Sequence, residues 1–170
     1  MEVLVNNRQK KVRLNLQRLR LIAEEIMRCE QVEENAELSV VLCDDEFIQK
    51  LNQEYLGKNR PTDVLSFPIE EEDFEQEVRL LGDVVISLET ASRQAEKMGN
   101  SVGLEVAFLL IHGILHLLGY DHKLNKGEMM RMKQREESVC RMLGEKKLLK
   151  GIEKKTPLIN RAYPAKSRLS

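Results

Sequence analysis

The segment that most constrains the fold is residues 102–118, VGLEVAFLLIHGILHLL, which is apolar on almost every side. A helix without a polar face has to be surrounded by other elements, so this segment predicts a central buried helix. Its 17 residues include Glu105, His112 and His116, which makes it a poor candidate for a membrane span.

The remaining segments predict both strands and helices. Apolar, β-branched runs predict strands at residues 3–5, 36–43, 64–68 and 80–87, and helical spacing predicts helices at 14–29, 44–55, 88–98 and 126–144. Pro68 indicates that its strand lies at a sheet edge or ends there. Together these elements predict an α+β fold, in which helices cover a mixed sheet of about four strands.

The three histidines of the chain lie close together in HGILHLLGYDH, residues 112–122. Four residues of helix turn by about 400°, so His112 and His116 project from one face. Gly119 can adopt a left-handed conformation, which would turn the chain back and bring His122 to the same point. Since plain histidines are costly to bury, we expect all three to bind one metal ion.

Three neutral nitrogen donors suit zinc better than magnesium or calcium, which prefer oxygen. Three protein ligands also leave a fourth position open, as in catalytic zinc sites, where a water molecule is acidified to a pKa of roughly 7. We therefore expect one Zn²⁺ ion, although nickel or iron also accepts imidazoles. Residues 1–149 are expected to form a single metallohydrolase domain, followed by a basic, mobile tail at 150–170.

The spacing of the histidines equals that of the metzincin proteases, which carry a general-base glutamate directly after the first histidine. Gly113 occupies that position here. This difference argues against a peptidase of that type, and another base or another substrate class has to be considered.

The histidine segment resembles the signature of the YbeY family of metallo-endoribonucleases. Two further segments, LNQEYLGKNRPTDVLSFP (51–68) and LGDVVIS (81–87), resemble other blocks of that family in the same order and spacing. The resemblance covers about residues 1–145. It implies a zinc-dependent enzyme that cuts single-stranded RNA, acts in 16S rRNA 3′-end maturation and ribosome quality control, and meets the ribosome or small-subunit proteins. It also implies His112, His116 and His122 as metal ligands.

One position departs from the family pattern. The family commonly has arginine directly after the tyrosine of the second block, where this chain has Leu56. Lys58 or Arg60, from the same loop, could supply the missing positive charge and stabilise the charge that develops on phosphorus. Asp121, next to the third histidine, could orient a ligand or serve only as a turn residue.

Two other strand residues are candidates for the site. Ser66 could line the cleft, and Asp83, an unusual residue for a strand, could face the site or cap a neighbouring element. The attacking group could be water or the RNA 2′-hydroxyl. Two alternatives to RNA cleavage stay open: a metal-dependent hydrolase of another class, such as a peptidase, and a non-catalytic ribosome-assembly factor with a structural zinc.

Charge and cysteine usage add limited information. The net charge of −1 gives no global field that would indicate a nucleic-acid partner. Locally, residues 70–77 carry six acids, and residues 150–170 carry a net charge of +5, which could contact rRNA phosphates or merely solubilise the chain end.

Cys29, Cys43 and Cys140 include no CxxC pair, which predicts reduced, buried or partly buried thiols. Neither a signal peptide nor a membrane span is expected, so we predict a cytoplasmic protein.

Overall fold

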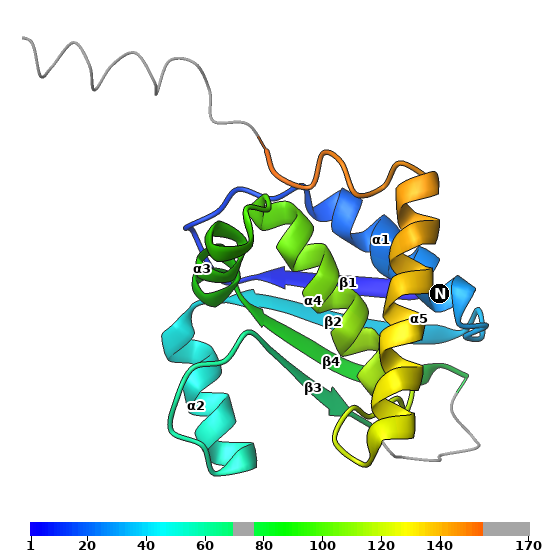
Figure 1. The fold of residues 1–170 in the computed structure, drawn as a ribbon, viewed down its shortest axis with the longest axis horizontal. Helices are drawn as coiled ribbons and strands as arrows, with labels where there is room; N and C mark the ends of the chain where they lie inside the picture. The colour runs from blue at the N-terminus through cyan, green and yellow to red at the C-terminus, as the bar shows by residue number, and fades with distance from the viewer. Residues whose placement is uncertain (70–76, 155–170) are drawn as a thin grey trace, which may run out of the picture.

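The computed structural model describes residues 1–69 and 77–154, and the fold is shown in Figure 1. The elements follow in the order β1 (Glu2–Asn7), α1 (Leu16–Cys29), β2 (Ala36–Cys43), α2 (Asp45–Leu56), β3 (Val64–Pro68), β4 (Arg79–Ser87), α3 (Leu88–Met98), α4 (Val102–Leu117) and α5 (Lys126–Glu145). Most of the predicted acidic stretch, residues 70–76, lies outside the described residues.

The strands form one four-stranded mixed sheet in the order β1-β2-β4-β3. Neighbouring strands β1, β2 and β4 are parallel, and β3 pairs antiparallel with β4 at the sheet edge. The larger core, which includes α1, α4 and α5, covers the face to which Val84 and Ile86 point. The opposite face, with Val85 and Leu65, packs against α2. The predicted α+β fold with about four strands is therefore confirmed.

Helix α4 lies at the centre of the larger core, where it packs against strands β3 and β4 and against helices α1, α3 and α5 (Figure 1). Its buried residues are Gly103, Val106, Ala107, Leu109, Leu110, Ile111, Gly113, Ile114 and Leu115. Ser101 caps its start by accepting a hydrogen bond from the backbone N–H of Leu104. The helix runs toward β3, so its C-terminal turns bring the histidines to the sheet edge.

Some predicted boundaries shift by a few residues. Strand β1 spans six residues because it pairs with β2 over its whole length, from Glu2 to Asn7. Helix α5 continues through Gly144, which the sequence suggested as its end, and stops at Lys146. Lys147, with a φ of 58°, adopts the left-handed conformation instead.

Packed structure continues beyond residue 149, the expected end of the domain. Ile152 is buried in the larger core, and its neighbour Glu153 forms a β-bridge with Leu14. The space for Ile152 exists because Gly103 has no side chain: a Cβ there would lie 2.9 Å from the Ile152 Cβ. Residues 155–170, the rest of the predicted tail, lie outside the described residues.

The burial of the three cysteines agrees with the prediction. All three thiols are free; Cys43 is buried, and Cys29 and Cys140 are partly buried. Burial, followed by the nearby negative charges of Asp44 and Asp45, raises the pKa of the Cys43 thiol to about 12.

Among the described helices, none is by itself long and apolar enough to cross a membrane, and α3 with α4 would reach that length only as a pair bent by 113°.

Candidate metal centre

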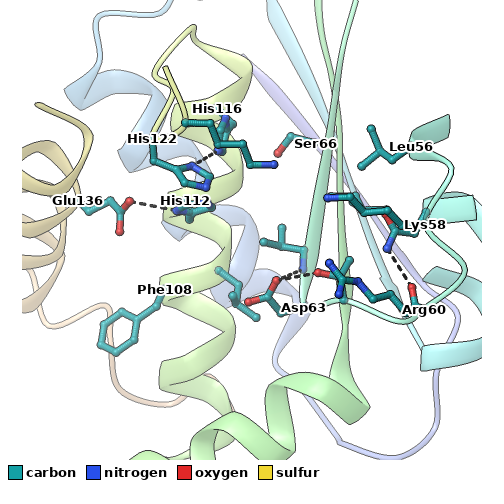
Figure 2. A pocket seen from close by; sticks show the side chains of 16 residues that line it. Leu56, Lys58, Arg60, Asp63, Ser66, Phe108, His112, His116, His122 and Glu136 are labelled. Carbon is teal, nitrogen blue, oxygen red and sulfur yellow. Dashed lines mark hydrogen bonds and ion pairs between the residues drawn. The ribbon is translucent and has the colours of Figure 1, made fainter. Parts of the chain in front are cut away.

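The three histidines meet at the C-terminal end of α4. His112 and His116 lie one turn apart on the helix, and Gly119, with a φ of 98°, turns the chain so that His122 returns to the same point (Figure 2). One nitrogen from each ring lies within 4.8 Å of the other two. The i,i+4 spacing and the glycine turn therefore bring together the group that the sequence predicted, and this group could hold one metal ion.

The donor set fits zinc. His116 Nε2 and His122 Nδ1 are 3.0 Å apart, and two nitrogens bound tetrahedrally at about 2.0–2.1 Å would be separated by about 3.3 Å. A small movement of the rings would therefore admit the ion. Neutral imidazole is the form that binds a metal, and the pKa of His116 is lowered mainly by burial and then by the neighbouring imidazoles of His112 and His122.

Helix α5 contributes a carboxylate to this group. Glu136 Oε1 lies 3.0 Å from His112 Nδ1, which leaves the other ring nitrogen of His112 for a metal (Figure 2). Such a carboxylate fixes the tautomer and the orientation of a ligand histidine. Glu136 was not among the residues predicted from the sequence, because it lies 24 residues from His112, among many charged residues. One signal was present: Glu136 follows the buried Met132 by one helical turn and so shares its face.

The loop between the second and third histidines is held by its tyrosine. The Tyr120 hydroxyl donates a hydrogen bond to Glu30 Oε2 at 3.1 Å, and the Arg135 guanidinium donates to the other oxygen of the same carboxylate. The Arg131 guanidinium lies over the Tyr120 ring, 5.0 Å from its centroid. These contacts tie the loop that carries His122 to both α1 and α5.

Gly113 allows α4 to lie directly on the sheet. A Cβ at this position would lie 2.6 Å from Val84 Cγ1 and 3.3 Å from Ser66 Oγ. The Ser66 hydroxyl donates a hydrogen bond to the Gly113 carbonyl at 2.9 Å. A glutamate at position 113, as in the metzincins, would thus point into the sheet, so a carboxylate near the metal has to come from another element.

The histidines open into a cleft of about 580 Å³ between α4, β3 and the loop that joins α2 to β3. Lys58, Arg60 and Lys123 bring positive charge to its lining, and Leu56 also lines it. Figure 2 shows Lys58 and Arg60 on the side of the cleft opposite the histidines. The two predicted cationic residues therefore lie where a bound phosphate could reach them.

The backbone of the cationic loop is anchored in the fold. Asn52 is only 2% exposed, and its Nδ2 donates a hydrogen bond to the Arg60 carbonyl at 2.9 Å. Asp63 accepts hydrogen bonds from its neighbour Val64 N at 2.8 Å and from Gln94 Nε2 at 3.2 Å. These hydrogen bonds fix the backbone of the loop from which the Lys58 and Arg60 side chains extend.

Two other candidates from the sequence are not among the residues that line the cleft. The Asp121 carboxylate accepts a hydrogen bond from the Lys123 backbone N–H at 2.8 Å, which is a turn contact, and its proposed orienting role stays a prediction. Asp83 alternates with Val84 along β4 and so lies on the face that packs against α2, away from the histidines.

Comparison with known proteins points to one family. A family model described as Endoribonuclease YbeY matches residues 4–144. An endoribonuclease YbeY from Syntrophus aciditrophicus is 43% identical over 138 residues, which cover 81% of this chain and 86% of the relative. Another, from Pelotomaculum thermopropionicum, is 45% identical over 145 residues, which cover 82% and 95%. The solution structure of a Thermotoga maritima protein matches with a TM-score of 0.59 and 28% identity, covering 86% of this chain and 92% of that protein.

The family match spans the parts of the chain that build the cleft. Residues 4–144 include the three histidines, the loop with Lys58 and Arg60, and Glu136. The curated relatives named above are more than 40% identical over most of both chains. The chain therefore belongs to the YbeY endoribonuclease family.

Proposed function

We propose that this protein is a zinc-dependent endoribonuclease that cuts single-stranded RNA during maturation of the 16S rRNA 3′ end and in ribosome quality control. The observation that carries the proposal is the three-histidine group, which faces Lys58 and Arg60 across one cleft. In this function the protein works in the cytoplasm and meets the ribosome or small-subunit proteins. Family membership supports the ribonuclease class of the reaction.

His112, His116 and His122 would hold the zinc ion. When bound, zinc would supply a Lewis acid and make hydroxide available near neutral pH. Glu136, 3.0 Å from His112 Nδ1, keeps that imidazole in the tautomer that a metal needs. The partial burial of the three rings limits the competition of bulk water for their nitrogens.

The cationic side of the cleft would bind the scissile phosphate. Lys58 and Arg60 place two positive charges on its lining, and Lys123 adds a third near the histidines. Fixed charges of this kind stabilise the extra negative charge that phosphorus carries as a nucleophile attacks. Asn52 holds the Arg60 backbone, so only the exposed arginine side chain has to be ordered when it contacts a phosphate.

Metal analysis combined with RNA cleavage tests the proposal. The wild-type protein is expected to purify with one zinc per chain and to cut a single-stranded rRNA fragment. His116→Ala is expected to lose the metal and at least about 100-fold in activity, since it removes a ligand of the reacting centre. Equal cleavage by both proteins would overturn the proposal. A 2′,3′-cyclic phosphate at the product end would identify the RNA 2′-hydroxyl as the nucleophile, and its absence would favour water.

The same material separates the two alternatives. A peptidase would degrade casein when zinc is added. The packing of Gly113 against Val84 argues against a peptidase of the metzincin type. A structural zinc predicts that chelation melts the fold, while His116→Ala still matures rRNA in cells. Either result would replace the ribonuclease proposal.

A role for the basic C-terminal segment in rRNA binding is a separate proposal. Deletion of residues 150–170 would also remove the buried Ile152, so a chain ending at Lys154 is the better test. RNA affinity at low salt is compared between this chain and the full-length protein. A fall in affinity is expected if residues 155–170 contact phosphates, and an unchanged affinity would exclude that role.

A further inference from the structure

Outside the cleft, basic side chains gather on the segment that follows β1 and at the start of α1. Residues 3–23 contain six basic side chains and no acidic one: Arg8, Lys10, Lys11, Arg13, Arg18 and Arg20. None of these six forms an ion pair with another described residue. In a chain whose net charge is −1, this is a marked segregation of positive charge.

A second segment, far away in the sequence, runs along the first. The Lys154 N–H donates a hydrogen bond to the Arg13 carbonyl at 2.9 Å, and the Asn15 N–H donates to the Ile152 carbonyl at 2.7 Å. Lys150 and Lys154 are exposed and add two more charges. The acid between them, Glu153, accepts a hydrogen bond from Gly103 N at 2.6 Å, so its carboxylate lies at the start of α4.

The two segments together form what we call the basic face, made of Lys10, Lys11, Arg13, Lys150 and Lys154. All five side chains are exposed. Arg8 is not part of this face, because its guanidinium lies over the Phe47 ring of α2, 4.3 Å from the ring centroid. Figure 1 shows both segments at the N-terminal end of α4, with the loop after β1 in dark blue and the segment after α5 in orange.

The backbone of the loop that carries Lys10, Lys11 and Arg13 is held by one buried side chain. Gln9 is 8% exposed, and its Nε2 donates hydrogen bonds to Asn7 Oδ1 at 3.0 Å and to the Val12 carbonyl at 2.9 Å. Its Oε1 accepts a hydrogen bond from Val12 N at 3.0 Å. Every polar atom of the Gln9 side chain is therefore used inside the loop, which fixes the backbone positions from which the exposed Lys10 and Lys11 side chains extend. A preorganised backbone reduces the entropy that is lost on binding.

The basic face is separated from the metal centre by the length of α4. Gly103, which contacts Glu153, and His116 are 13 residues apart on this helix, a distance of about 20 Å at 1.5 Å per residue. A nucleotide at the histidines therefore leaves the basic face free to contact another part of the same RNA.

We propose that the basic face binds the phosphate backbone of RNA outside the segment that enters the cleft. The choice of RNA as the polyanion rests on the proposed function. The positive charge of the surface and its hydrogen-bonded backbone are observed independently of that function. Exposed lysine and arginine side chains without bidentate base contacts recognise phosphates without regard to sequence. The basic face would thus hold structured or flanking rRNA while the cleft selects the strand to be cut.

The test compares two RNAs and two triple variants of the full-length, zinc-loaded protein. The variant Lys10→Ala/Lys11→Ala/Arg13→Ala removes three charges from the basic face. The control Lys50→Ala/Lys97→Ala/Lys133→Ala removes three exposed charges scattered over α2, α3 and α5. Binding of a long rRNA fragment is measured over a salt series, and cleavage is measured on a short oligonucleotide that fills only the cleft.

We expect the basic-face variant to bind the long RNA about tenfold more weakly. Its affinity should also depend less steeply on salt: the slope of log affinity against log salt should be smaller in magnitude by about 2, because three phosphate contacts contribute about 0.7 each. Cleavage of the short oligonucleotide should stay unchanged, and the control should change neither quantity by more than about twofold. An unchanged slope and affinity in the basic-face variant would overturn the inference. So would binding that responds to phosphatidylserine vesicles but not to RNA. If the wild type fails to cut RNA but the basic-face variant still loses affinity for it, the proposed function fails and the basic face stands.

Discussion

The Nδ1 atom of His112 and the Oε1 atom of Glu136 lie 3.0 Å apart across the contact between α4 and α5. This pair links a residue that the sequence identified as a metal ligand to one that it did not. Glu136→Ala should lower the affinity for zinc about 10- to 100-fold, because His112 loses the group that fixes its tautomer and orientation. Competition with a chromogenic chelator measures the affinity directly, without reference to RNA cleavage.

Glu137→Ala provides the matched control, since it removes the same charge from the neighbouring, exposed position of α5. It should hold zinc as tightly as the wild type. If the two variants have equal zinc affinities, Glu136 does not position the ligand.

The close packing of α4 on the sheet predicts an unusual cost for a small substitution. Gly113→Ala should lower the free energy of unfolding by about 1–3 kcal/mol, because the added Cβ overlaps Val84, from which it would be 2.6 Å away. In an exposed helix the same change would stabilise the fold by about 0.5–1 kcal/mol.

Gly144→Ala supplies that comparison. Gly144 lies in α5, and a Cβ there would meet only Leu149 Cδ1, at 3.9 Å. Urea unfolding of both variants should shift the midpoint in opposite directions. A Gly113→Ala protein at least as stable as the wild type would show that the sheet moves enough to accommodate the added methyl group.

The starts of α2 and α3 are locked together by Asp45. Its carboxylate accepts hydrogen bonds from the Ser87 and Thr90 hydroxyls, both at 2.6 Å, and from Arg93 at 2.8 Å. In return, Glu89 accepts a hydrogen bond from Asp45 N at 2.9 Å. Partial burial pushes the pKa of Asp45 up, but the hydrogen bonds and the charge of Arg93 outweigh it, so the pKa is lowered.

Asp45→Ala should therefore destabilise the protein by about 1–3 kcal/mol at neutral pH. Since the folded pKa is depressed, the stabilisation is fully present above the unfolded pKa of about 3.9 and is lost as the pH falls through the folded value. The difference between wild type and variant in thermal unfolding should thus narrow below about pH 4. Glu46→Ala is the control, because Glu46 is 80% exposed and its effect should stay within about 0.5 kcal/mol. A difference between wild type and Asp45→Ala that is constant with pH would contradict this account of Asp45.

The cationic loop offers a test of the family's missing arginine. Arg60→Ala should lower kcat/KM on single-stranded RNA at least about tenfold, because the charge that faces the phosphate is lost, while zinc content stays at the wild-type level. Leu56→Arg, which restores arginine after Tyr55, should recover part of that loss, since position 56 lines the same cleft. Full activity in Arg60→Ala would show that Arg60 does not replace the arginine.

Local pattern alone predicted most of the elements and the histidine group. The run of apolar residues at 102–118 requires a buried helix wherever it is placed, and residues four apart share a helical face in any fold. The predicted left-handed conformation of Gly119 is confirmed. It could be predicted because a tight turn after a helix depends only on neighbouring residues. The zinc ion, the RNA substrate and the catalytic roles of Lys58, Arg60 and Asp121 stay predictions.

Tertiary structure decided which distant segments meet. Glu136 reaches His112 only because α5 packs beside α4, and Ile152 is buried only because Gly103 leaves room for it. The basic face likewise depends on hydrogen bonds between residues 13–15 and 152–154. Periodicity along the chain reports which face of an element is apolar, but it carries no information about which other element will cover that face. The histidine group therefore followed from the sequence, whereas the carboxylate beside it and the surface that we assign to RNA emerged only from packing.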